Sequence, residues 1–202
     1  MKIRWCLFAL AIALVMSPIT YAETFVEAEE DAPLTAAIAE RKEDAVFLQI
    51  GNYAAVSDGV LTWIDRDNKE VRPYIKDDRT MVPLRFLTEA MGAVVEYDSE
   101  TRGVAVTLGD AVMALQIGEA GYTLNGQAFS MDCAPEISAD RTFVPVRFVS
   151  EALGKAVAWL SEERIVVITS VTYPWNEDND LEKIVISEIQ LSLAPIGRDR
   201  IQ

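Results

Sequence analysis

Histidine is absent from this sequence, and its absence limits the chemistry that the other reactive side chains could perform. The chain has 202 residues, two cysteines and no histidine. The Ser–His–Asp triad, the cysteine–histidine nucleophile and most zinc sites use an imidazole, so these classes are excluded. Ser–Lys and paired-carboxylate chemistry stay formally open, but no nucleophile with a neighbouring base can be named. We therefore predict a non-enzymatic protein with no catalytic, cofactor-binding or metal-binding residues.

Carboxylates are the most abundant charged groups, with 32 Asp and Glu against 18 Lys and Arg and a net charge of −14. Acidic residues alternate in two clusters: Asp65, Asp67 and Glu70, and Glu177, Asp178, Asp180 and Glu182. Neither cluster has the order or the glycine of an EF-hand loop, so solvated loop charge is the favoured interpretation and calcium binding the alternative. The acidic surface repels phosphates, which disfavours nucleic acid and anionic lipid as partners.

The first 22 residues have the pattern of a secretory signal. Lys2 and Arg4 precede an apolar run over residues 7–16, and a small residue stands at Ala22, where we expect cleavage. An uncleaved anchor is the alternative, but a run of about ten residues is short for roughly 30 Å of hydrocarbon. We expect a secreted, extracellular protein associated with the cell envelope, with no transmembrane segment after cleavage. Cys133 would then be its one cysteine, a buried thiol in preference to an intermolecular disulfide.

A sequence repeat occupies most of the chain. Residues 78–98 read DRTMVPLRFLTEAMGAVVEYD and residues 140–160 read DRTFVPVRFVSEALGKAVAWL, an offset of 62 that gives 16 identities in 31 pairs when carried to 108 and 170. Upstream, residues 48–51 match 115–118 at an offset of 67. The first copy therefore has five extra residues, which we place in a charged surface loop within 65–70.

Each copy has the same expected order of elements: a hairpin, a helix and a second hairpin. The hairpin turns are Asp58-Gly59 and Asn125-Gly126. The helices run over residues 84–91 and 146–153 and end at Gly92 and Gly154. The predicted fold class is α+β, with two tandem small domains that each pack a curved antiparallel β-sheet around one short helix.

The repeated string Asp-Arg-Thr-x-Val-Pro-x-Arg-Phe, followed by Glu-Ala-x-Gly, resembles the copper amine oxidase N-terminal-like domain. The resemblance covers residues 46–171. It implies an antiparallel sheet wrapped around a helix, and an accessory module found in secreted and surface proteins of Gram-positive bacteria. The oxidase activity of such proteins resides in a separate catalytic domain with three copper-binding histidines and a topaquinone. Asn52-Tyr53 lacks the acidic residue expected next, and this chain has no histidine, so copper oxidase chemistry is not expected.

These observations divide the chain into five segments. They are a signal peptide (1–22), an acidic linker or arm with a short helix over 34–43 (23–45), copy 1 of the repeat (46–110), copy 2 (111–171), and a C-terminal extension with an edge strand over 183–193 (172–202). Alternating apolar residues suggest that strand, which could complete a sheet or pair with a partner.

Aromatic and charged side chains offer further candidates. Trp63, Tyr173 and Trp175 are expected at the surface, where they could stack on glycans, whereas Tyr97 and Trp159 occupy equivalent repeat positions and are expected to pack within the fold. Other expectations concern ion pairs: Arg85 with Glu89, Arg147 with Glu151, and Arg79 and Arg141 with the strand turn of their own copy.

Two functions are compatible with the sequence. The first is a binding or structural module at the cell envelope that contacts cell-wall polymer or an envelope protein, and it predicts an exposed aromatic or apolar patch. The alternative is an enzyme or an enzyme-regulatory subunit, such as a carboxylate-dependent hydrolase or an inhibitor-like partner of one. It predicts a pocket with converging carboxylates at the repeat junction. The oligomeric state is left open.

Overall fold

The computed structural model describes residues 32–197. Residues 38–197 belong to one compact unit, and all contacts described below lie within it. The predicted signal peptide and residues 23–31 of the acidic arm lie outside the described residues. The described chain begins with helix α2 (Ala32–Lys42), where the sequence predicted a short helix.

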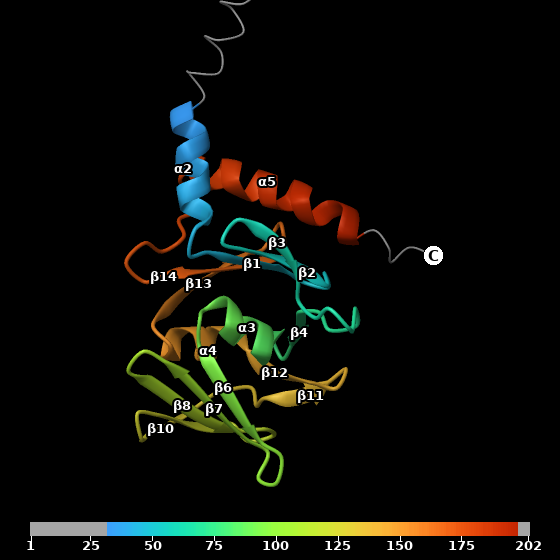
Figure 1. Ribbon diagram of the computed structural model, residues 1–202, viewed down its shortest axis with the longest axis vertical. Helices are drawn as coiled ribbons and strands as arrows, with labels where there is room; N and C mark the ends of the chain where they lie inside the picture. Colours follow the sequence, from blue (N-terminus) through green and yellow to red (C-terminus); the bar gives the residue numbers. More distant parts are fainter. Residues whose placement is uncertain (1–31, 198–202) are drawn as a thin grey trace, which may run out of the picture. The chain divides into compact units, whose positions relative to one another are not determined.

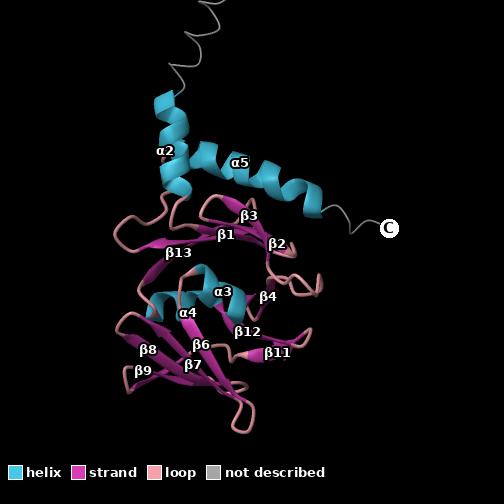
Figure 2. Cartoon of the chain, in the orientation of Figure 1, coloured by secondary structure: helices cyan, strands magenta, loops and turns pink. Residues whose placement is uncertain are grey.

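Both copies contain the predicted hairpin, helix and second hairpin in this order, together with three further strands before each helix (Figure 1). Copy 1 contains β1 (Val46–Gln49), β2 (Ala54–Ser57), β3 (Val60–Trp63), β4 (Tyr74–Lys76), β5 (Arg79–Pro83), α3 (Leu84–Ala90), β6 (Val94–Asp98) and β7 (Gly103–Leu108). Copy 2 contains β8 (Ala111–Gln116), β9 (Gly121–Leu124), β10 (Gln127–Ser130), β11 (Glu136–Ser138), β12 (Arg141–Pro145), α4 (Val146–Ala152), β13 (Lys155–Leu160) and β14 (Ile165–Ser170). Strands dominate over short helices, which confirms the α+β class (Figure 2).

Local sequence signals account for the turns and helix ends. Asp58 and Gly59 have φ values of 51° and 74°, and Asn125 and Gly126 have 50° and 80°, as a two-residue hairpin turn with both central residues left-handed requires. Pro83 and Pro145 immediately precede the two short helices, where the missing N–H costs no helical hydrogen bond. Gly92 and Gly154 then end these helices at φ 72° and 75°.

The two copies share their sheets. The strand orders are β13-β14-β1-β2-β3, β10-β9-β8-β7-β6 and β11-β12-β5-β4, so every sheet contains strands from both copies. In the four-stranded sheet Val82 pairs with Val144, its own equivalent in the other copy. If the two copies are exchanged, each five-stranded sheet takes the strand order of the other. The copies are therefore related by a pseudo-twofold axis at the β5–β12 pair. Sharing covers strand edges that each copy alone would leave open.

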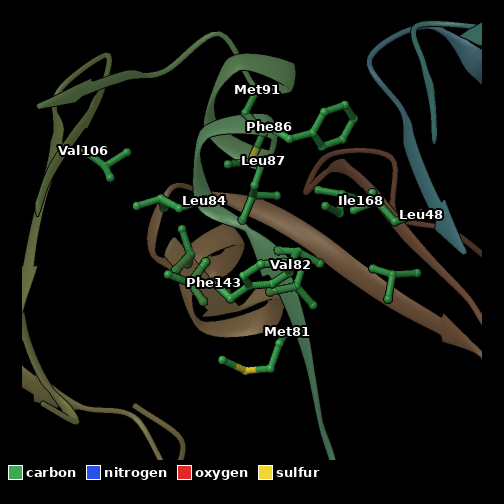
Figure 3. Packing of buried hydrophobic residues seen from close by; sticks show 14 of the residues in the cluster. Leu48, Met81, Val82, Leu84, Phe86, Leu87, Met91, Val106, Phe143 and Ile168 are labelled. Carbon is green, nitrogen blue, oxygen red and sulfur yellow. The ribbon is translucent and has the colours of Figure 1, made fainter. Parts of the chain in front are cut away.

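One large core lies between the two five-stranded sheets. Figure 1 shows α3 and α4 between these sheets, and Figure 3 shows Leu84 and Leu87 of α3 packed among side chains of both copies. Val106 lies on one side of α3, while Leu48 and Ile168 lie on the other (Figure 3). Because this core combines both copies, neither copy encloses a complete core of its own.

The C-terminal extension corrects one prediction. Residues 183–193 were expected to form an edge strand, but they lie within helix α5 (Asp180–Gly197). Val185, Ile189 and Leu193 are buried at helical spacing, in a second core formed against the outer face of the β13–β3 sheet. The Asn179 side chain accepts a hydrogen bond from the Leu181 N–H at 2.9 Å and so caps the helix. Nearly every other residue of 183–193 is apolar, a pattern that both a strand and a half-buried helix can have. The Asn179 cap favours the helix.

Among the residues that the structure describes, none of the helices combines the length and the apolar character that crossing a membrane requires.

Candidate binding groove

A groove of about 770 Å³ opens beside β3 and α3. Its floor is apolar and includes the buried side chains of Leu84, Phe86 and Val104. Its walls include Val60 of β3 and Tyr97 of β6, which are 64% and 53% exposed. The groove therefore offers an apolar surface to solvent, of the size that ligand sites in proteins usually have.

The groove lies beside a residue of β3 that is smaller than its equivalent in copy 2. Thr62 of β3 corresponds to Phe129 of β10, and both occupy the same position in the equivalent hairpins. Phe129 stacks on Tyr122 with ring centroids 5.5 Å apart, whereas Thr62 pairs across the strands with Ala55. Two aromatic rings thus fill in copy 2 the space that a threonine and an alanine leave in copy 1.

The extra loop of copy 1 forms one end of the groove and is held by Asp65. This carboxylate accepts hydrogen bonds from the backbone N–H groups of Asp67 at 2.9 Å and Asn68 at 3.0 Å. It also accepts one from Arg141 Nε of copy 2 at 2.6 Å. Burial alone would raise the pKa of Asp65, but the hydrogen bonds, that of Arg141 foremost, hold this pKa below its usual value.

Arg79 and Arg141 correct a second prediction, because the carboxylate partner of each belongs to the other copy, while within its own copy each donates to the backbone carbonyl of the preceding residue, Asp78 or Asp140. Arg79 of copy 1 donates from Nε to Asp132 of copy 2 at 2.8 Å, and Arg141 of copy 2 donates to Asp65 of copy 1. The two pairs are equivalent under the pseudo-twofold axis. The prediction was wrong because it assumed that each copy closes its own sheet, whereas the shared sheets place these arginines beside the other copy's loop.

Carboxylates outnumber cations at the rim. Aside from the Asp65–Arg141 pair, the groove and an adjoining cavity of about 290 Å³ are lined by five carboxylates and three cations. The carboxylates are Asp44, Asp58, Asp67, Glu89 and Asp140, and the cations are Arg66, Arg85 and Lys155. Asp44, Asp58 and Glu89 lie together in the smaller cavity, and Asp58 and Glu89 line both cavities. This end of the groove is therefore acidic.

The alternative function required carboxylates that converge as an acid and a base. Such a pair needs one carboxyl group that holds its proton near neutral pH, which means a raised pKa. Asp65 is shifted in the opposite direction and is committed to Arg141. Asp65 is therefore not available as the protonated acid of such a pair.

The predicted aromatic platform is divided between two places, and its rings already have partners. Trp63 is 46% exposed but stacks on Tyr53, with centroids 5.2 Å apart and an interplanar angle of 6°. Tyr173 is exposed and Trp175 is partly buried, and Arg41 lies 4.2 Å and 4.9 Å from their ring centroids. Each of these contacts covers one face of a ring and so reduces the ring area that is left for a sugar.

Tyr97 was expected to pack within the fold, but it is exposed at the groove, while Trp159 is partly buried against the core as expected. Both residues lie on edge strands and pair across the strands with equivalent buried valines, Tyr97 with Val104 and Trp159 with Val166. Of the two helix ion pairs expected, the structure has Arg147 with Glu151 at 3.9 Å. Arg85 and Glu89 instead lie at the groove.

In each of the two acidic clusters considered for calcium, some of the carboxylates pair with other groups of the protein. In the first, Asp65 holds the loop as described above. In the second, Glu182 is 2% exposed and pairs with Arg41 at 2.6 Å, and Asp180 pairs with Lys183 at 3.0 Å. Within residues 32–197 no three His, Cys, Asp or Glu side chains are arranged to hold a metal ion.

Cys133 is buried as expected, with its Sγ 3.7 Å from the Sδ of Met81, and burial raises the pKa of its thiol. Nearby, Glu136 of copy 2 accepts a hydrogen bond from the Tyr74 hydroxyl of copy 1 at 2.5 Å and pairs with Lys76. The hydrogen bonds from Lys76 and Tyr74 lower the pKa of Glu136. The raised pKa keeps the Cys133 thiol protonated, and the Glu136 carboxylate is held by Tyr74 and Lys76 of the other copy. These residues therefore form a contact between the two copies.

Comparison with known proteins gives one family match and one curated relative. The model of the copper amine oxidase N-terminal domain matches residues 65–168, about half of the chain. One match spans parts of both copies, as the shared sheets would lead one to expect. A protein of Brevibacillus choshinensis named "Protease inhibitor" is 28% identical over 88 residues, which are 44% of this chain and 27% of that protein. The chain thus matches about a quarter of the length of this relative.

Proposed function

The chain belongs to the copper amine oxidase N-terminal domain family, and we propose that it is an exported, non-catalytic accessory module that binds a protein partner at the cell envelope. The family is a non-catalytic one, and the oxidase chemistry associated with its name needs residues that this sequence lacks. The signal-like N-terminal segment supports export, and the acidic surface favours solubility over adsorption to anionic lipid.

The groove beside β3 is the observation that carries this proposal. It combines an apolar floor with exposed apolar walls, and it occurs where copy 1 differs from copy 2. Packing alone does not require the smaller residues of copy 1, because copy 2 accommodates the two stacked rings of Phe129 and Tyr122 at the equivalent positions. A partner that buries Val60 and Tyr97 would remove exposed apolar area from water.

A protein partner fits this surface better than a wall polymer. Sugar binding commonly uses exposed aromatic faces, but Trp63 stacks on Tyr53 and Arg41 lies over Tyr173 and Trp175. The apolar floor with a charged rim instead resembles the core and rim of a protein interface.

Photocrosslinking in the native host tests this function. A photoreactive residue at Val60 should form a crosslink to a protein, and the crosslink should disappear when Thr62→Phe fills the groove. The exposed side chain of Thr107 lies on β7 of the other five-stranded sheet, so Thr107→Phe is a matched control that should leave the crosslink unchanged. Retention on purified cell-wall polymer without any protein crosslink at Val60 would contradict the proposal.

Protease inhibition is a second candidate, favoured by the name of the Brevibacillus relative. In this case the protein bound at the groove is a protease. Inhibition by the purified protein of proteases from its host's culture medium should weaken in Thr62→Phe and persist in Thr107→Phe. Equal inhibition by both variants would assign any inhibitory activity to another surface.

A further inference from the structure

We propose that the groove binds an extended peptide that adds as a further strand to the free edge of β3, with apolar side chains on the groove floor and a basic side chain at the acidic end. This inference rests on the proposed function and names the chemistry of the partner segment. Three features of copy 1 carry it: the edge of β3, the orientation of the groove and the charge at its end.

Strand β3 is a terminal strand with an apolar edge. It is last in the order β13-β14-β1-β2-β3, and within the described chain it pairs only with β2. Val60, Leu61 and Trp63 are exposed, although edge strands are normally protected by charged residues, proline or a bulge. The equivalent edge strand β10 reads Gln-Ala-Phe-Ser and is more polar. The apolar edge is therefore a property of copy 1.

The backbone of β3 presents hydrogen-bonding groups to an added strand. Ser57 and Val60 close a two-residue hairpin, and the Ile64 N–H donates to the Tyr53 carbonyl at 3.0 Å. Because hydrogen-bonded positions alternate in an antiparallel pair, Val60, Thr62 and Ile64 bond toward β2. The N–H and C=O groups of Leu61 and Trp63 are then directed away from β2. An extended peptide could bond to both residues.

The groove lies where the side chains of the added strand would point. Val60 and Thr62 share the face of β3 that looks onto the groove, and alternate residues of a neighbouring strand lie on that same face. These residues would meet the apolar floor formed by Leu84, Phe86 and Val95. The intervening residues would lie beside Leu61 and Trp63, which are both exposed.

Charge complementarity selects a basic residue at one end. Asp58 stands at the turn that begins β3, and Asp44 and Glu89 line the same small cavity. Lys155 is the one cation among the residues that line this cavity, so the carboxylates are in excess there. A lysine or arginine of the peptide, placed beside Val60, would reach these carboxylates.

Binding to the full protein, purified as its host processes it, tests the peptide chemistry. The probe is a short peptide that alternates valine and threonine and ends in lysine. Matched peptides replace the lysine with norleucine or glutamate, or carry N-methyl groups on the amides that would face β3. We expect the lysine peptide to bind, the glutamate peptide to bind roughly tenfold more weakly or worse, and the methylated peptide not to bind.

Protein variants locate the bound peptide. Asp58→Asn keeps a residue suited to the turn, because Asn125 occupies the equivalent position, and Glu89→Gln removes the second charge. The double variant should weaken binding of the lysine peptide roughly tenfold and leave the norleucine peptide unchanged. Equal loss for both peptides, or binding that survives Thr62→Phe or N-methylation, would overturn the inference.

The two proposals can fail separately. If none of the peptides binds while the Val60 crosslink still captures a protein in a Thr62-dependent manner, the peptide chemistry is wrong and the proposed function stands. If the crosslink is also absent, the proposed function fails as well.

Discussion

At the scale of single residues, the two copies act as internal controls for each other. Asp65 and Asp132 occupy equivalent positions and pair with equivalent arginines, yet Asp65 is the more buried of the two and also accepts two backbone hydrogen bonds. Thr62 and Phe129 show the same principle for packing. A different side chain or environment at an equivalent position therefore has a large effect on the local contacts, because the surrounding backbone is the same in both copies.

We predict that Asp65→Asn lowers the free energy of unfolding by about 1–3 kcal/mol, because it weakens a charge-assisted hydrogen bond and the hydrogen bonds that order the loop. Asp132→Asn should cost less, since its pair with Arg79 is exposed. Chemical denaturation of both variants measures the difference. An equal or larger loss in Asp132→Asn would contradict the role assigned to Asp65.

The same pair has a defined pH dependence. The pKa of Asp65 is lower in the folded protein than its ordinary value of 3.8, so its contribution to stability is complete above that value. The stability difference between the wild type and Asp65→Asn should therefore shrink as the pH falls through the folded-state pKa. Denaturation curves of both proteins between neutral and acidic pH measure this difference. A stability difference that grows as the pH falls would mean that folding raises the pKa of Asp65, which would contradict this prediction.

At the scale of elements, the sequence predicted turns and helix ends well, but it predicted poorly which elements pack against each other. Asp58-Gly59, Asn125-Gly126, Gly92 and Gly154 predicted hairpins and helix ends because backbone conformation there depends on the residue itself. The strand predicted over 183–193 was wrong, because an alternating apolar pattern does not distinguish a strand from a half-buried helix. Helix α5 is buried because it packs against a sheet surface formed by residues distant in sequence, and its own residues do not show this contact.

Helix α5 is fixed by a buried ion pair. Glu182 of α5 pairs with Arg41 at 2.6 Å, and both side chains are almost fully buried. We predict that Glu182→Ala lowers the free energy of unfolding by about 3–5 kcal/mol, because it leaves the Arg41 charge buried without its partner.

Glu188→Ala provides the control, because Glu188 pairs with Lys42 at a more exposed site on the same helix. Its cost should be about 1 kcal/mol or less. Chemical denaturation and proteolysis of residues 171–180 report the two effects. Similar stability of the two variants would contradict the account of the buried pair.

At the scale of the whole molecule, the repeat was visible in the sequence but the exchange of strands was not. Identity between 78–108 and 140–170 says that two segments have similar folds, and it is silent on which strand edges meet. The pairing of Val82 with Val144 and of β1 with β14 depends on contacts between copies. The alternative function predicted a pocket at the repeat junction, but the residues that line the groove were not identified, although the contrast between Thr62 and Phe129 was readable.

Shared sheets predict a single unfolding transition for residues 46–171. Neither copy has a complete core, so both should unfold together, and far-ultraviolet circular dichroism and tryptophan fluorescence should report the same midpoint. Trp63 lies in copy 1 and Trp159 in copy 2, so single-tryptophan variants follow each copy separately. Two separated midpoints would mean that the copies fold as independent domains.

Hydrogen exchange at β3 tests the binding account most directly. The amides of Leu61 and Trp63 should exchange more slowly when the lysine peptide is present, because the added strand takes up their outward-facing hydrogen bonds. Ala128 and Ser130 of β10 are their equivalents in copy 2 and should be unaffected. Slower exchange confined to β3 is the result that this account predicts. Unchanged exchange at β3 with saturating peptide, or equal slowing at β10, would contradict it.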